Sequence, residues 1–357
     1  MQACKVQLKN ATGGSRWKVV FLSLIVTLIS ASTAVQAATG RNAVVVTASN
    51  AAQNQLLVYS SNGNLIQTIS TQGKGGASGN AGGIEAQGSL VAVVNFGSQT
   101  VSLFERGNNG FQFKQLIPTV PNPVSVAFGN NHLYILGATK VESHLMNGSS
   151  DHVNSNPDGV VTLLKADGSA AQVGLVENQL IITEKSNVIE TVNLLSNGAV
   201  GGLPTLVQNI PANVNAPFGL VTRGNNAYVT IAHANEISLV RNGKVLTVTG
   251  SGTQMAPCWL TLVGPFLFSS NSPSMSISRY AVYGQKIVQD AAVAAALNGD
   301  PTDIDSGAGL VAVIDGSGQI SHLSIFSVDE DGNLTLLQTA ATINGAANGV
   351  AVVWDRD

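Results

Sequence analysis

Short apolar runs alternate with polar turns along most of the chain, and the pattern returns about every 40 to 48 residues. Each unit opens on a run such as VVVTA, VAVVN or YVTIA, which a polar turn and a second run follow. Alternation of this length indicates β-strands. A repeat of this size made of short strands is typical of radial repetition, in which each four-stranded blade buries its faces against its neighbours. Seven such units are visible, starting at Val44, Val91, Leu133, Leu180, Tyr228, Phe266 and Val311.

One unit shows the expected layout of a blade. Its turns are Gly224-Asn225-Asn226, the loop 232–235 and Asn242-Gly243. An Asn-Gly pair between two apolar runs is the strongest short hairpin signal, because both turn residues must accept positive φ. The turns therefore divide the unit into four predicted strands, at 218–222, 227–231, 236–241 and 244–249.

The two ends of the repeat region are incomplete in complementary ways. Residues 349–354 look like an innermost strand with no second strand after it, and 43–47 look like a second strand with no first. Pairing them completes one blade and removes the exposed edges of an open sheet. The sequence thus predicts one all-β domain over 38–357: a seven-bladed β-propeller of four-stranded antiparallel blades, closed by the C-terminal strand on the N-terminal blade.

Three segments depart from the regular pattern. An insertion over 138–158 leaves the fourth strand of its blade unassigned, so that either the insertion contains a strand or the blade is short. The glycine-rich stretch 73–83 lacks the Gly-Lys-Ser/Thr end and the helix of a phosphate loop, and it is predicted to be a flexible loop between blades. The alanine-rich run 287–297 has helix propensity and predicts a short helix joining blades six and seven.

The N-terminus carries Lys5, Lys9, Arg16 and Lys18 without an acid, then an apolar run over 19–29 and small residues ending at Ala37. This order is that of a secretory signal peptide, and it predicts cleavage after residue 37. The alternative is a membrane anchor, for which an apolar run of about 11 residues is short against the roughly 20 that a span needs. Cleavage removes four of the 17 basic residues and none of the 20 acidic ones, so the formal charge changes from −3 to −7. We therefore expect a periplasmic or secreted protein without stable membrane insertion.

Composition narrows the classes of partner. Charged residues make up 10% of the chain, against roughly 25% in ordinary globular proteins, and this argues against electrostatic binding of nucleic acid. Loss of Cys4 with the signal peptide leaves Cys258 alone, which excludes an internal disulfide and predicts a buried small hydrophobic residue at that place. A monomer without a cofactor is expected. No pair or trio of His and Cys has the spacing of a zinc site, so no metal is expected either.

In a propeller, the loops between second and third strands and those between blades open on one face, around the central channel. An acyl-transfer reaction there needs a base and a group that holds the developing oxyanion. The predicted catalytic residues on this face are His233 with Glu184, as the base and its partner, and Lys185 for the oxyanion. The predicted ligand-binding residues are His144, His152, Asp303 and Asp315. Because no spacing joins these residues, the alternative is that they are single solvated loop residues.

Parts of the repeats resemble a known family. The segments 228–230 (YVT), 93–95 (VVN) followed by 100–104 (TVSLF), and 323–326 (LSIF) followed by 329–335 (DEDGNLT) are similar to the repeats of lactonase-like and YVTN-type seven-bladed propellers. The resemblance covers nearly all of 38–357. It implies the propeller fold and, as activities of the family, 6-phosphogluconolactonase-like lactone hydrolysis or a muconate-type cyclase reaction.

The same resemblance shows where the chain departs from the family. Lactonase-type members often carry Pro-Arg-His, or a lone His or Arg, where a first strand begins beside the channel. The matching sites in this chain are 123–125 (PVS), 217–219 (PFG) and 257–259 (PCW), which keep the proline and lack the Arg and His. Binding of a small molecule, glycan or protein on the loop-rich channel face is therefore the leading expectation. The alternative is a lactone hydrolase or cyclase, and the third is a structural envelope or surface protein.

Overall fold

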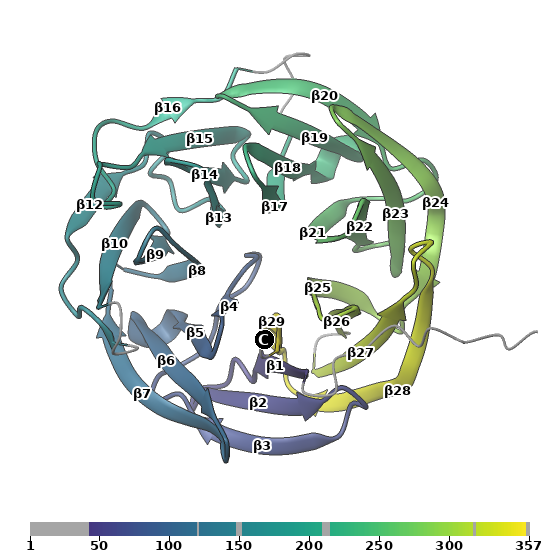
Figure 1. Ribbon diagram of the computed structural model, residues 1–357, viewed down its shortest axis with the longest axis horizontal. Coiled ribbons are helices and arrows are strands. Elements are labelled where there is room, and N and C mark those ends of the chain that lie inside the picture. Colours follow the sequence, from purple (N-terminus) through teal and green to yellow (C-terminus); the bar gives the residue numbers. More distant parts are fainter. Residues whose placement is uncertain (1–42, 120, 148–151, 209–214, 317–318, 355–357) are drawn as a thin grey trace, which may run out of the picture. The chain divides into compact units, whose positions relative to one another are not determined.

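The computed structural model describes residues 43–119, 121–147, 152–208, 215–316 and 319–354. These residues form seven antiparallel blades in a ring around a central channel (Figure 1). The predicted fold is confirmed. Among the residues that the structure describes, none of the helical segments has the length and apolar character needed to cross a lipid bilayer. The predicted signal peptide, residues 1–37, lies outside the described residues.

The first three blades show the order of strands from the innermost, at the channel, to the outermost. Blade one consists of β29 (Asn348–Val353), β1 (Val44–Ala48), β2 (Gln55–Ser60) and β3 (Leu65–Ser70). Blade two consists of β4 (Ile84–Gln87), β5 (Leu90–Asn95), β6 (Thr100–Gly107) and β7 (Gly110–Pro118), with the 3-10 turn η1 (Phe96–Ser98) after β5. Blade three consists of β8 (Pro123–Gly129), β9 (His132–Gly137), β10 (Lys140–Asn147) and, both paired with β10, β11 (His152–Val153) and β12 (Gly159–Thr162).

The remaining four blades follow in chain order. Blade four has β13 (Ala170–Val176), β14 (Gln179–Glu184), β15 (Val188–Asn193) and β16 (Thr205–Leu206). Blade five has β17 (Pro217–Arg223), β18 (Asn226–Ile231), β19 (Glu236–Arg241) and β20 (Lys244–Gly250), with η2 (Ala232–Ala234) after β18. Blade six has β21 (Pro257–Val263), β22 (Phe266–Asn271), β23 (Ser276–Tyr283) and β24 (Lys286–Ala296). Blade seven has β25 (Asp300–Gly307), β26 (Leu310–Gly316), β27 (Ile320–Val328) and β28 (Leu334–Asn344).

Ring closure occurs as predicted, between the two ends of the repeat region. β1 pairs antiparallel with β29, from Val44 opposite Val353 to Ala48 opposite Asn348. The apolar side chains of β29 are almost fully buried, with Val350 3% and Val352 1% exposed. Val350 and Val352 belong to a hydrophobic cluster that also contains Leu310 and Ala312 of blade seven. The core of the ring thus lies between neighbouring blades, and β29 contributes to it on the seam where the ring closes.

Two of the irregular segments are now assigned. The insertion 138–158 contains a strand, β10, which is the third strand of blade three, and β12 supplies the fourth. The helix predicted over 287–297 is wrong, because this segment forms the outer strand β24. It pairs with β23 from Tyr283 opposite Lys286 to Ser276 opposite Ala296. A ladder of this length overrides the high helix propensity of the alanines, and Ile287 is buried against the blade.

Candidate functional site

The first strands of the blades line a cavity of ≈ 210 Å³ inside the central channel. On three of these strands the lining reaches the second half of the strand, as with Phe128 of β8, Leu175 of β13 and Thr222 of β17. One part of the wall is apolar and includes Val126, Leu220 and Trp259. The polar side chains that line the cavity are Glu85, Gln172, Thr222, Thr261, Asp303 and Asp305.

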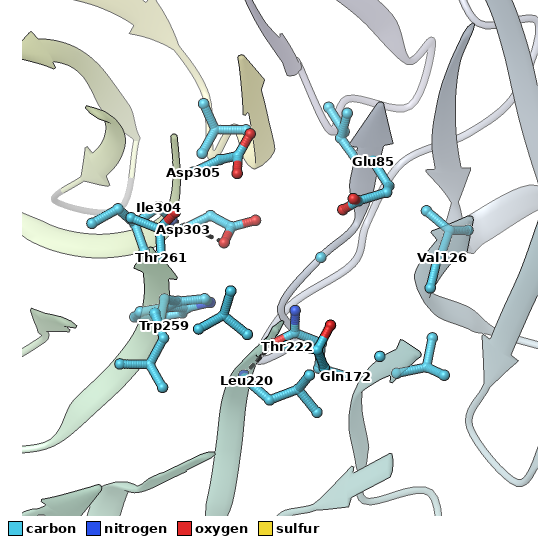
Figure 2. Close-up of a pocket in the computed structure, with 18 of the residues that line it drawn as sticks. Glu85, Val126, Gln172, Leu220, Thr222, Trp259, Thr261, Asp303, Ile304 and Asp305 are labelled. Atoms are coloured by element: carbon cyan, nitrogen blue, oxygen red, sulfur yellow. Dashed lines mark hydrogen bonds between the residues drawn. The ribbon is translucent and has the colours of Figure 1, made fainter. Parts of the chain in front are cut away.

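Three of these side chains are carboxyls that face one another across the cavity. Asp303 and Asp305 both lie on β25 and share one side of it, because side chains two apart on a strand point the same way. Glu85 reaches toward them from β4, as Figure 2 shows. Since β4 and β25 belong to blades two and seven, this meeting of carboxyls depends on closure of the ring through blade one.

The surroundings of the three carboxyls favour their protonated forms. Loss of bulk water and the nearby charges of Asp305 and Asp303 raise the pKa of Glu85 to about 8. The Glu85 side chain is exposed to the cavity, so water inside the cavity can reach it, although protein surrounds the cavity. Burial and the charge of Asp305 raise the pKa of Asp303 to about 8, against hydrogen bonds from backbone amides such as that of Ile304 at 2.9 Å. Burial raises the pKa of Asp305 only to about 6, because the amide of Val352 donates to its Oδ2 at 2.8 Å. Near neutral pH the cluster therefore contains both protonated and ionised carboxyls.

No positive charge balances this cluster within the cavity. None of the described residues that line it is a lysine, arginine or histidine. Across the described ranges, no three His, Cys, Asp or Glu side chains are placed so as to hold a metal ion, and this includes the three channel carboxyls. Carboxyls in this arrangement can exchange protons or hydrogen bonds with an uncharged ligand.

The glycine-rich segment before β4 crosses the channel above the cavity. Asn80 donates to Val124 O at 2.6 Å, its Oδ1 accepts from Asn348 Nδ2 at 2.9 Å, and its carbonyl accepts from the indole N–H of Trp259 at 3.1 Å. The amide of Ala81 donates to Ala171 O at 3.2 Å. Residues 79–83 are thus bonded to blades one, three, four and six. The predicted position between blades is confirmed, and the loop is tied across the channel.

A glycine is needed in this loop. Gly82 has a φ of +61°, and a Cβ there would lie 3.0 Å from Ser125 Oγ and 3.1 Å from Gln172 Nε2. The loop contacts the beginnings of the first strands, which lie on the loop-rich face. It therefore separates the cavity from that face, and the cavity lies in the half of the channel nearer the turns between first and second strands.

Of the predicted ligand-binding residues, Asp303 lines the cavity. Asp315 instead bonds through Oδ1 to His322 Nδ1, at 2.8 Å, within blade seven. His144 is fully buried in blade three, with Nδ1 2.8 Å from Asn154 O and Nε2 3.1 Å from Glu142 Oε1. His152 is exposed on β11. The structure brings none of these three residues to the lining of the cavity, as far as its lining residues are described.

The three predicted catalytic residues lie apart from the cavity lining. His233 is exposed in η2, and among the described residues its side chain makes no hydrogen bond or ion pair. Lys185 donates from Nζ to Gly79 O at 2.5 Å and lies 5.9 Å from the ring centroid of Phe218, so that it holds the loop that crosses the channel. Burial lowers the pKa of Lys185. A catalytic role for these residues stays a prediction.

Glu184 is buried beside a second carboxyl. Burial, together with a hydrogen bond and the charge of Glu190, raises the pKa of Glu184 to about 9. The Glu190 carboxylate accepts hydrogen bonds from the backbone amides of Leu164, at 3.0 Å, and Lys165, at 2.8 Å. Glu184 Oε1 has no donor nearby, which fits a protonated acid that donates to Glu190. Glu184 thus belongs to a structural carboxyl pair in blade four.

This pair predicts a dependence of stability on pH. Between pH about 4.5 and pH about 9 the unfolded chain loses the Glu184 proton while the folded protein keeps it, so the free energy of unfolding falls as pH rises. Glu184→Gln can still donate to Glu190 and does not titrate. We expect its free energy of unfolding to exceed that of the wild type by a margin that grows with pH, by at most about 1.4 kcal/mol per pH unit. Urea unfolding at pH 5, 7 and 9 measures the margin, and a constant margin would contradict the assignment.

Sequence reasoning missed Glu85 and Asp305. A signal for Asp305 was present, because acids at 303 and 305 in a predicted first strand must share one side of it. The sequence contains no comparable signal for Glu85, because the short strand IEAQ has no second acid beside it. Cys258, predicted to be a buried small hydrophobic residue, is only partly buried and packs against the core cluster that holds Phe218 and Trp259. Burial raises the pKa of its thiol to about 12, which removes it as a nucleophile.

The fold and the site together define a seven-bladed β-propeller with an acidic cavity in its channel. No family model matches the chain, and no curated protein matches it either. Among solved structures it is similar to putative 6-phosphogluconolactonases of Bacteroides fragilis (12% identity, TM-score 0.63, covering 88% of this chain and 99% of that one) and Bacteroides uniformis (12%, 0.64, 87% and 99%). It is also similar to a periplasmic gluconolactonase of Pseudomonas aeruginosa (13%, 0.60, 88% and 99%). At these identities the similarity shows the shared fold.

Proposed function

We propose that this protein binds a small, uncharged, polyhydroxylated molecule, such as a sugar, in the channel cavity. The observation that carries the proposal is the meeting of Glu85, Asp303 and Asp305 in a cavity whose other described lining residues are uncharged. A protonated carboxyl has both a donor and an acceptor, which suits a hydroxyl group. The apolar wall, including Trp259, suits the C–H face of a sugar ring. A volume of ≈ 210 Å³ lies below the roughly 300–1,000 Å³ of drug-sized sites and fits a small ligand.

The charge of the cavity selects against anions. A phosphorylated sugar would bring its charge next to the carboxyl cluster without a lining cation to balance it. The proposed ligand class is therefore the unphosphorylated one. We also propose that the protein works as a monomer and that it does so outside the cytoplasm. The basic, apolar and small-residue order of residues 1–37 supports the second of these proposals.

Lactone hydrolysis is the second candidate, favoured by the different pKa values within the cluster. Asp305, with a pKa of about 6, is ionised at pH 7 and can take a proton from an attacking water. Glu85 and Asp303, with pKa values of about 8, still carry protons there and can donate to the carbonyl oxygen as it becomes negative. When the tetrahedral intermediate collapses and the ring C–O bond breaks, one of these acids can give its proton to the leaving ring oxygen. The lactonases among the structural neighbours make sugar lactones the first substrates to try.

Calorimetric titration with glucose and with glucose 6-phosphate tests the binding proposal, since the two differ only in the phosphate. We expect glucose to bind and the phosphate to bind far more weakly. Glu85→Ala removes a side chain to which no hydrogen bond from a described residue is assigned, so it should spare the fold and weaken binding about tenfold. The control is Glu330→Ala, at an exposed site in the loop between β27 and β28. Equal binding of both sugars, no binding of either, or binding unchanged in Glu85→Ala would contradict the proposal.

A further inference from the structure

A second polar surface lies on the face that carries the turns between first and second strands. Two hollows, of ≈ 750 Å³ and ≈ 330 Å³, share Asn178 and Leu194 and so adjoin each other. They run from the 130–131 turn of blade three over blade four to the 242–243 turn of blade five. We call the two hollows together the amide groove, after the side chains that line it: Asn130, Asn131, Asn178, Gln179, Asn193, Asn197, Gln208 and Asn242.

Turn geometry explains only some of these amides. Asn131 and Asn242 have positive φ, of 58° and 51°, which asparagine tolerates better than other non-glycine residues. Asn178 and Gln208 have no such conformation, and both are exposed. Among the described residues, neither side chain makes a hydrogen bond. Each therefore presents a free donor and a free acceptor to the groove.

The charge of the groove is close to balanced. Its lining contains one acid, Glu177, and one base, Lys244, among the described residues. Leu206 is 53% exposed and Leu195 54% exposed, so that apolar surface lies beside the amides. A ligand that matches this surface is uncharged, rich in hydroxyl groups and partly apolar, and it is long enough to extend over parts of three blades.

An extended peptide fits the surface less well. Peptides commonly bind by adding a strand to an open sheet edge. In blade four, the outer edge of β15 is already paired with β16 at Glu190 and Thr191. Leu194 also forms a bridge with Val200. The protein's own chain thus occupies the outer edge of β15, with which such a peptide would have to pair.

We propose that the amide groove binds a neutral polysaccharide. The site lies apart from the channel cavity and shares no residue with it. The proposal therefore stands independently of the function proposed for the cavity.

Affinity electrophoresis of the protein lacking residues 1–37 provides the test, in native gels that contain starch, mixed-linkage β-glucan, galactomannan or, as the charged counterpart, alginate. We expect one of the neutral polysaccharides to retard the protein and alginate not to do so. The double variant Asn178→Ala/Gln208→Ala should weaken the retardation about tenfold, as expected for two lost hydrogen bonds. Asn62→Ala/Asn108→Ala is the matched control, because these two exposed amides stand in turns of blades one and two.

Glu85→Ala separates the two proposals, since it alters the cavity and leaves the amide groove intact. Retardation that persists in Glu85→Ala and weakens in the Asn178/Gln208 variant supports the groove. Retardation that weakens only in Glu85→Ala would assign polysaccharide binding to the channel and overturn this proposal. Absence of retardation by every neutral polysaccharide, or stronger retardation by alginate, would also overturn it.

Discussion

Deletion of residues 348–357 should abolish cooperative folding of the propeller. The deletion removes β29 and leaves β1 with an unpaired edge at the centre of the ring. It also removes Val350, Ala351, Val352 and Val353, each at most 3% exposed. Burial of a valine side chain stabilises a protein by about 1.5–3 kcal/mol, so the three valines account for a large share of the roughly 5–15 kcal/mol that holds a domain.

Closure through β29 also holds the functional region. Asn348 bonds to Asn80 in the loop across the channel, and the amide of Val352 bonds to Asp305. We expect the truncated chain to show no cooperative thermal transition by circular dichroism. The control is a deletion of residues 355–357 alone, which leaves β29 whole. A chain without β29 that melts like the full-length protein would refute the role assigned to closure.

Asp305→Asn should lower any lactonase activity at least roughly a hundredfold, the low end expected for loss of a general base. The amide can still accept the hydrogen bond from Val352, so the fold should change little. The wild-type rate should rise as pH passes about 6, where Asp305 ionises, and fall above about 8, where Glu85 and Asp303 lose their protons.

Hydrolysis of glucono-1,5-lactone, followed from pH 5 to pH 9 and corrected for the uncatalysed reaction, measures both effects. Glu330→Asn serves as the control for an acid outside the cavity. Hydrolysis that Asp305→Asn leaves unchanged would remove the carboxyl cluster from the reaction. If His233→Ala lowered the rate instead, the residues predicted from the sequence would be the catalytic ones.

Most of the fold could be predicted from the sequence because blade structure is local. The four strands of blade five follow from alternation and from Asn242-Gly243, and the observed strands β17–β20 differ from the prediction by at most one residue at each end. The prediction for 287–297 failed because alanine has a high helix propensity and the segment shows no clear alternation of apolar and polar residues. Its pairing with β23, which decides the structure, cannot be seen in the segment itself.

The site could be predicted less well because it is assembled over long distances. Glu85 and Asp305 are 220 positions apart in the chain, and they face each other only because β29 closes the ring. Glu184 and His233 looked suitable because both follow second strands near the channel. Whether such a residue is free or buried depends on its neighbours, and Glu190 fixes Glu184 in a carboxyl pair. Residue type and position along the chain do not contain this information.

The most direct test of the central claim is a crystal structure of the protein soaked with glucose. The account predicts a sugar in the channel beneath residues 79–83, with its hydroxyl groups within hydrogen-bonding distance of Glu85, Asp303 or Asp305 and its ring against Trp259. The same soak of Glu85→Ala crystals should give weaker occupancy. A sugar bound elsewhere, with the cavity occupied by water alone, would contradict the account.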